Sequence, residues 1–249
     1  MDNICYRSGN NILGIEQEWG EIKKLKIRKY RRDNERRLIE MYRDDLILNY
    51  CKEKDVLHIG ACNSPYHIER ARRGALLHQK LQGVCKELIG IDIDRNAIEE
   101  LKKLGVANIY PGDIIKNEYD IDLTNYKFDY IVAGEVIEHL ENPGIALDNI
   151  KDLMNKDTKL ILTTPNAFSY GVIKQLLTGE EKVHQDHVFW PSYKTLLRLF
   201  KYKNLKVEYF TYCMYGCFRE VSTVNRIAYK LILKRKKHLM PGLFFVLSL

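Results

Sequence analysis

Short apolar runs alternate with segments of helical period along most of the chain. The runs predict strands at residues 55–60, 87–92, 107–110, 128–133, 159–163 and 205–213. Apolar positions at helical spacing predict helices at residues 66–82, 95–104, 142–155 and 191–203. Strands that alternate with helices are typical of parallel βαβ units. The pattern therefore predicts an α/β fold built on a doubly wound, mostly parallel sheet.

Three regions follow from this pattern. Residues 1–50 are expected to form an N-terminal helical extension, in which residues 21–50 place a dense row of Lys and Arg between apolar positions. Residues 51–224 are expected to form the α/β domain, and its polar and aromatic segment 165–190 is expected to act as a lid or substrate loop. Residues 225–249 form a tail that is basic and apolar by turns.

The tail supports two interpretations, because it joins the basic stretch KLILKRKKHLM (230–240) to the apolar run LFFVLSL (243–249). The apolar run can pack on the sheet as a final strand, with the lysines merely solvated. Alternatively, the basic side chains can meet anionic headgroups while the apolar run inserts shallowly, which makes the protein peripheral to a membrane. Both interpretations stay open at this point.

Composition limits the compartment and the kind of partner. The chain of 249 residues is 45% hydrophobic, which is enough for one sizeable core, and no apolar run approaches the roughly 20 residues that span a bilayer. Its net charge of +7 suits an anionic partner and also suits a merely soluble protein. The six cysteines lack metal-ligand spacing and no secretion signal precedes them, so free thiols in the cytoplasm are expected.

The chemistry-bearing residues follow the predicted strands in order. Ligands of open parallel sheets collect at the carboxyl ends of the strands. Gly60 ends the first strand, Asp92 ends the second and suits ribose hydroxyls, and Asp113 follows the third and suits an adenine amino group. The loop GACNSP lacks the further glycines that a pyrophosphate requires, which disfavours a nicotinamide-dependent oxidoreductase. The three strand ends therefore predict a site for an adenosine.

At this point the chain resembles the class I S-adenosylmethionine-dependent methyltransferases, through VLHIGACNSP, LIGIDIDRNAI, YPGDI, FDYIVAGEVIEHLENPG and LILTTPN between residues 55 and 166. The resemblance implies a Rossmann-like sheet of seven strands and S-adenosylmethionine as cofactor. The family usually has an acid where His58 stands, and glycines where Cys62 and Ser64 stand. The positions expected to contact the cofactor are His58, Gly60, Ala61, Asp92, Ile93, Asp113, Ile114 and Glu135.

The segment EVIEHL supplies the catalytic residues. On a helix beginning near Glu135, residues 135, 138 and 139 would share one face. His139 suits a general base that takes a proton from a hydroxyl, assisted by Glu138 and His187. Alternatively, Glu135, Glu138, His139 and either His187 or His184 bind a divalent cation, a pattern similar to that of methyltransferases acting on the 2′-hydroxyl of small RNAs. A third interpretation is an ordinary helix start.

The acceptor is expected to be hydroxylated. Polar and aromatic side chains in the lid suit a sugar or nucleoside: Asn166, Tyr170, His184, His187 and Trp190. Short segments resemble O-methyltransferases of polysaccharide biosynthesis and of quinone precursors. We therefore expect methylation of a hydroxyl of a glycan, a nucleotide-linked sugar or another small molecule.

Two alternatives remain. A metal-dependent RNA 2′-O-methyltransferase fits EVIEHL and the basic N-terminal helix, but a nucleic acid is disfavoured because no RNA-binding module is recognisable. A cofactor-binding protein without activity is the other. The oligomeric state stays open.

Overall fold

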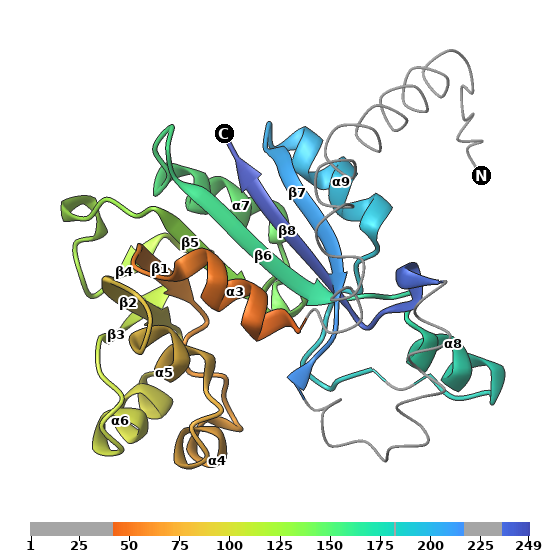
Figure 1. Cartoon of the computed structure of the whole chain (residues 1–249), viewed down its shortest axis with the longest axis horizontal. Coiled ribbons are helices and arrows are strands. Elements are labelled where there is room, and N and C mark those ends of the chain that lie inside the picture. Colours follow the sequence, from red (N-terminus) through yellow and green to blue (C-terminus); the bar gives the residue numbers. More distant parts are fainter. Residues whose placement is uncertain (1–41, 182, 217–235) are drawn as a thin grey trace, which may run out of the picture. The chain divides into compact units, whose positions relative to one another are not determined.

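The structure is a computed structural model that describes residues 42–181, 183–216 and 236–249 (Figure 1). These residues belong to one compact unit, which runs from Met41 to Leu249. Most of the predicted N-terminal extension, residues 1–41, lies outside the described residues.

An eight-stranded sheet forms the centre of this unit, in the order β4-β3-β2-β1-β5-β6-β8-β7. Strands β1, β2, β3, β5 and β6 are parallel, and β8 runs antiparallel to both of its neighbours. The six predicted strands are confirmed, β8 in the tail makes the seven that the resemblance implied, and the two-residue edge strand β4 is additional. The bounds are β1 Asp55–Ile59, β2 Glu87–Asp92, β3 Ile109–Asp113, β4 Glu118–Tyr119, β5 Tyr130–Gly134, β6 Lys159–Pro165, β7 Lys206–Cys213 and β8 Gly242–Ser248.

Helices cover both faces of the sheet, so the predicted doubly wound α/β fold is confirmed (Figure 1). On one face, α3 and α5 pack against Val56, Val132 and Phe244. On the other face, α7 and α9 pack against Leu57, Ile131 and Phe245. The bounds are α3 Arg43–Cys51, α4 His67–Arg72, α5 Leu77–Gln82, α6 Arg95–Lys103, α7 Pro143–Asp152, α8 Tyr170–Leu177 and α9 Tyr193–Tyr202, with 3-10 turns η1 Leu123–Asn125, η2 Ile137–His139 and η4 Lys237–Leu239.

The single helix predicted over residues 66–82 is wrong, because this segment forms the two short helices α4 and α5. Gly74 separates them with a backbone φ of +62°, a left-handed conformation that a helix does not contain. The helical spacing of apolar residues continues through the break. The pattern alone therefore did not reveal it.

Residues 243–248 of the apolar run lie in β8, which is fully buried between β6 and β7. Phe244 and Phe245 are both 0% exposed and face opposite helix layers. This packing confirms the final-strand interpretation. Shallow membrane insertion of the run is wrong, because its side chains already fill the core. Among the described residues, no helix is both long enough and apolar enough to cross a bilayer.

Candidate active site

The loop after β1 turns sharply at Gly60, which has a φ of +72°. A Cβ atom at this position would lie 2.6 Å from Cγ2 of Val136, so only glycine fits without displacing a neighbour. The backbone N–H groups of Gly60 and Ala61 both donate to the carbonyl oxygen of Ile91, at 3.0 and 3.2 Å. These bonds tie the loop to the end of β2.

Asp92 lies beside this loop and is held in place by two backbone donors. The N–H of Cys62 donates to its Oδ2 at 2.8 Å, and the N–H of Asp94 donates to its Oδ1 at 3.0 Å. Burial raises the pKa of Asp92, while these hydrogen bonds act in the opposite direction. A carboxylate oxygen can accept more than one hydrogen bond, so both oxygens of Asp92 can also accept from hydroxyl groups of a ligand.

Asp113 ends β3, the next strand outward. Its Oδ1 accepts from the backbone N–H groups of Ile115 and Lys116, at 2.9 and 3.2 Å. Ile93, directly after Asp92, is 71% exposed and offers an apolar surface to a ligand. The structure thus places Gly60, Asp92 and Asp113 at three adjacent strand ends, in the predicted order.

Three positions expected to contact the cofactor are buried: His58, Ala61 and Ile114. His58 is 2% exposed, and its Nδ1 lies 3.3 Å from Nδ1 of His78 on α5. Nε2 of His78 in turn lies 3.1 Å from the carbonyl oxygen of Ala107, so it carries the proton and donates. His58 is therefore paired within the fold, and sequence reasoning missed its partner.

The helix expected to begin near Glu135 is replaced by the single 3-10 turn η2. Glu135 has a φ of +61°, a conformation that is strained for a residue with a side chain. Its carboxylate accepts from Oγ1 of Thr163 at 3.2 Å and lies 3.8 Å from the guanidinium of Arg43. Glu135 therefore does not share a helix face with Glu138 and His139.

Glu138 is 0% exposed, and only one of its two carboxylate oxygens has a hydrogen-bond partner among the described residues. Its Oε2 accepts from Oγ1 of Thr164 at 3.0 Å, whereas its Oε1 has no hydrogen-bond partner among the described residues. Burial, followed by the charge of Glu135, raises the pKa of Glu138 well above its usual range. A buried oxygen without a partner is costly, and a ligand can supply that partner. Thr164 went unnoticed in the sequence, although it lies in the motif LILTTPN.

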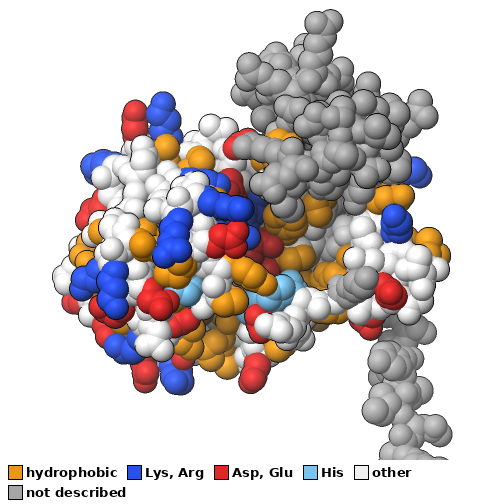
Figure 2. Space-filling view, turned by 90° about the horizontal axis from the view of Figure 1, so that it is seen from below, with side chains coloured by type: hydrophobic (Ala, Val, Ile, Leu, Met, Phe, Trp, Pro, Cys, Tyr) orange, Lys and Arg blue, Asp and Glu red, His pale blue; other side chains and the backbone are white. Residues whose placement is uncertain are grey.

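Three histidines, His139, His184 and His187, gather beside Glu138 and are called the histidine cluster below. The ring centroids lie 4.7 Å apart for His139 and His187, and 5.1 Å apart for His184 and His187. Figure 2 shows histidine side chains at the surface with hydrophobic side chains next to them. Two of the predicted lid residues, His184 and His187, therefore lie beside His139.

The position of the Nδ1 proton of His139 and the pKa of His187 follow from their surroundings. Nδ1 of His139 lies 3.0 Å from the carbonyl oxygen of Asp186, so it donates its proton there and leaves a lone pair on Nε2. Burial, together with the charges of His139 and His184, lowers the pKa of His187 to about 4. The ring of His187 is therefore neutral at pH 7 and keeps a nitrogen lone pair.

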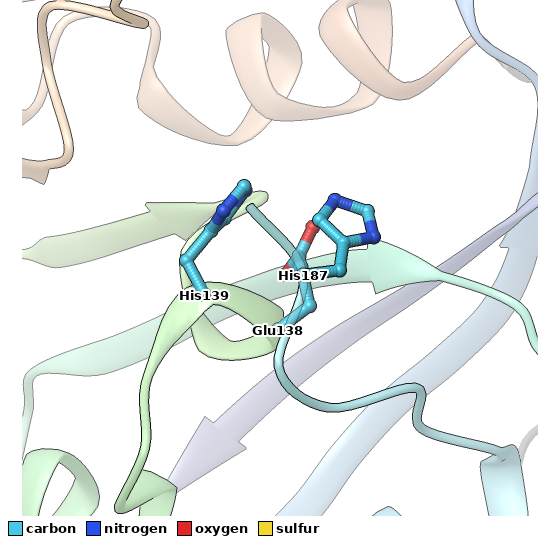
Figure 3. A group of neighbouring side chains, drawn as sticks. All are labelled: Glu138, His139 and His187. Atoms are coloured by element: carbon cyan, nitrogen blue, oxygen red, sulfur yellow. The ribbon is translucent and has the colours of Figure 1, made fainter. Parts of the chain in front are cut away.

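Glu138, His139 and His187 together form a group of metal-ligand type. One ligand atom from each lies within 4.8 Å of the others, and the three side chains point to the same side (Figure 3). The backbone N–H groups of Val188 and Phe189 donate to the carbonyl oxygen of Glu138, at 3.0 and 3.2 Å, which fastens the lid to η2. The group can hold either a proton or a divalent cation.

Asn166 and Trp190, which were also predicted to contact the acceptor, differ in their hydrogen bonding. Nδ2 of Asn166 donates to the carbonyl oxygens of His238 and Met240, at 2.9 and 2.8 Å, so Asn166 fastens the segment before β8. Nε1 of Trp190 is buried without a hydrogen-bond partner among the described residues. Of these two, only Trp190 retains an unused polar atom.

Solved structures share this fold at low sequence identity. The small RNA methyltransferase HEN1 is 22% identical, with a TM-score of 0.52 over 83% of this chain and 24% of that chain. The magnesium protoporphyrin IX methyltransferase ChlM of Synechocystis PCC 6803, solved with bound SAH, is 12% identical, with a TM-score of 0.52 over 98% of this chain and 90% of that chain. These similarities extend to the fold alone.

A curated relative and a family match extend the comparison. The uncharacterized protein MJ1123 of Methanocaldococcus jannaschii is 25% identical over 146 residues, which cover 57% of this chain and 65% of the relative. The match therefore spans less than two thirds of that relative. Residues 67–209 match the family described as a methyltransferase domain. The match covers more than half of the chain, so the chain belongs to this family, and its fold is that of the class I S-adenosylmethionine-dependent methyltransferases.

Proposed function

We propose that this enzyme methylates a hydroxyl group of a glycan, a nucleotide-linked sugar or another small molecule, with His139 as the general base. The observation that carries the proposal is the hydrogen bond from His139 to the carbonyl of Asp186, which leaves Nε2 free to take a proton. Oε1 of Glu138 and Nε1 of Trp190, both buried without partners among the described residues, add hydrogen-bonding capacity for hydroxyls.

Gly60, Asp92 and Asp113 are proposed to hold the cofactor, with Ile93 against its adenine ring. Bound there, S-adenosylmethionine supplies a methyl group on a positively charged sulfur, and its demethylated form leaves after transfer. The chain has to bring the acceptor oxygen in line with that methyl group and remove the proton of the hydroxyl. Nε2 of His139 takes this proton, and Asp186 stabilises the resulting imidazolium through its carbonyl oxygen.

A divalent cation is the alternative at the same position. Oε1 of Glu138 has no partner among the described residues, and His139 and His187 each offer a lone pair, so the residues fit a cation. These three side chains would hold it, and it would lower the pKa of the acceptor hydroxyl. The carboxylate of Glu135 accepts from Thr163 and lies beside Arg43, outside this group of three, so Glu135 is not included in the proposed ligand set.

Replacing His139 tests the base. His139→Ala is expected to lower methyl transfer at least about 100-fold, the usual contribution of general base catalysis, while S-adenosylhomocysteine binds with nearly unchanged affinity. Transfer of radiolabelled methyl to a panel of sugars measures the first quantity, and calorimetry measures the second. His238→Ala, at an exposed histidine, is the matched control. Full activity of His139→Ala contradicts the proposal.

A chelator distinguishes catalysis by His139 as a general base from catalysis that needs a bound divalent cation. If His139 acts alone, EDTA leaves the activity of the wild type unchanged. Loss of activity in EDTA that Mg²⁺ or Mn²⁺ restores would establish the cation in place of the simple base.

An RNA 2′-O-methyltransferase is the second candidate function. The metal-ligand spacing of Glu138, His139 and His187 favours it, since such a cation can orient the terminal hydroxyl of a ribose. Methyl transfer to a short RNA in the presence of Mn²⁺, abolished by removal of its terminal 2′-hydroxyl, distinguishes this acceptor from a sugar.

We also propose a cytoplasmic location, which agrees with four free thiols among the described cysteines.

A further inference from the structure

We propose that the acceptor carries an uncharged apolar group beside the hydroxyl that is methylated, and that this group binds to an apolar surface of the lid. This surface, called the lid patch, consists of Phe168, Leu176, Leu177, Val183 and Val188. The inference rests on the proposed function and narrows its acceptor to amphipathic molecules, such as alkyl or isoprenyl glycosides.

Exposed apolar side chains are concentrated in the lid. The described residues include eleven large hydrophobic side chains that are exposed, and five of them lie between residues 165 and 190. Leu177 is 83% exposed, which is the largest value of the eleven. Single exposed apolar residues are ordinary, but a concentration of them indicates a binding surface.

Helix α8 in the lid is apolar but not buried. Four of its eight residues are Val, Ile or Leu, and none of its residues is buried. Figure 1 shows α8 beyond the carboxyl end of β6, away from the helices that cover the two faces of the sheet. An apolar helix that contributes nothing to the core of the described residues gains its stabilisation elsewhere.

Two residues of the lid patch, Val183 and Val188, directly adjoin the histidine cluster along the chain. Val188 directly follows His187, is 61% exposed, and donates its N–H to the carbonyl oxygen of Glu138. Val183 directly precedes His184. A molecule whose hydroxyl reaches His139 therefore has the exposed side chain of Val188 nearby, and a purely polar acceptor leaves this side chain in water.

The charge of the lid favours an uncharged apolar group over an anionic membrane. By sequence, residues 165–190 contain the acids Glu180, Glu181 and Asp186 and the bases Lys174 and Lys182, so their net charge is 2 − 3 = −1. The whole chain has a net charge of +7. Membrane-binding surfaces of this kind are rich in Lys and Arg.

Matched glycosides test the inference on the full chain. n-Octyl β-D-glucopyranoside and methyl β-D-glucopyranoside have the same free hydroxyls and differ only in the apolar chain. With S-adenosylhomocysteine present and the detergent below its micelle concentration, saturation-transfer NMR is expected to show about tenfold tighter binding of the octyl compound. Leu177→Gln should remove most of this difference. Leu104→Gln, at an exposed leucine on another part of the surface, is the control and should keep it.

The outcomes separate the alternatives. Equal binding of both glycosides, or an octyl preference that survives Leu177→Gln, overturns the inference. So does a dimer that Leu177→Gln dissociates in sedimentation velocity, or vesicle binding that it abolishes, since the patch then serves a second copy or a membrane. Equal rates of methylation of the octyl and methyl glycosides are consistent with the proposed function and refute this inference. Octyl binding at the patch with no hydroxyl methylated refutes the proposed function instead.

Discussion

The pair formed by His58 and His78 is the clearest departure from the family pattern at the scale of single residues. Gly90 makes room for it, since a Cβ atom there would lie 2.7 Å from Cε1 of His78. The carbonyl of Ala107 fixes the proton of His78 on Nε2, so His58 donates from its own Nδ1 to Nδ1 of His78. Two neutral imidazoles thus form a hydrogen bond where the family has an acid.

This pair predicts that the protein loses stability as the pH falls. Burial lowers the pKa of His78 to about 4, whereas an unfolded histidine has a pKa of about 6.5. Between pH 7 and pH 5 the unfolded chain gains a proton at this position that the folded chain does not take up. The free energy of unfolding should therefore decrease by about 2 kcal/mol from this residue alone. Urea unfolding at the two pH values measures it.

A double variant isolates the contribution of the pair. His58→Leu with His78→Leu replaces both partners by apolar groups, and the carbonyl oxygen of Ala107, which loses His78, still accepts from Nε2 of Gln82 at 3.0 Å. Its unfolding free energy should depend less on pH than that of the wild type. His238→Ala, which removes an exposed histidine, should leave the pH dependence unchanged. An equally steep dependence in the double variant contradicts the prediction.

At the scale of elements, the sequence predicted strands better than turns. A strand such as β5 is an uninterrupted apolar run, because a central parallel strand is buried on both faces. The break at Gly74 and the 3-10 turn η2 depend on backbone conformations that leave the apolar spacing unchanged. Glu135 illustrates the result, since its strained backbone turns its carboxylate toward Arg43 and Thr163.

The part of the candidate site that directly follows predicted strands could be predicted from the sequence. Gly60, Asp92 and Asp113 follow strands directly, so their positions were set once the sheet was recognised. Glu138, His139 and His187 come together as expected, although 48 residues separate His139 from His187. Partners that join distant segments, such as Thr164 for Glu138 and His78 for His58, leave no periodic signal in the sequence.

Strand β8 yields a prediction for the core. Phe245 is 0% exposed and its ring lies against Tyr193, Phe200 and Phe210, with centroids 6.1, 5.1 and 4.7 Å away. Phe245→Ala should lower the free energy of unfolding by about 3–5 kcal/mol, through lost burial and the cavity that remains. Denaturant unfolding measures this. Leu249→Ala, at a residue that is 48% exposed just beyond the strand, should change stability by no more than about 0.5 kcal/mol.

At the scale of the whole molecule, cofactor binding and folding are linked. A ligand that binds only the folded chain stabilises it by about 2.7 kcal/mol at 100 times its dissociation constant. S-adenosylhomocysteine should therefore raise the melting temperature, because its proposed contacts join three strand ends of one sheet.

Asp92→Ala should abolish most of that rise. Removing hydrogen bonds to a charged group costs about 1.5–3 kcal/mol of binding, which is roughly a tenfold to hundredfold loss of affinity. Differential scanning fluorimetry across a ligand titration measures the effect. Asp157→Ala, at an exposed carboxylate in the turn before β6, is the control and should retain the full rise. An Asp92 variant with a normal ligand response would remove Asp92 from the proposed site.

The position of β8 has a consequence for synthesis on the ribosome. Strand β6 pairs with β5 and β8, and among the described strands β7 pairs only with β8, which is made after both β6 and β7. A nascent chain therefore exposes one open hydrogen-bonding edge of β6 until residues 242–248 have emerged. During this interval the incomplete sheet is a template for pairing with other polypeptides. Slow translation of the segment between β7 and β8 would lengthen the time in which the chain depends on chaperones.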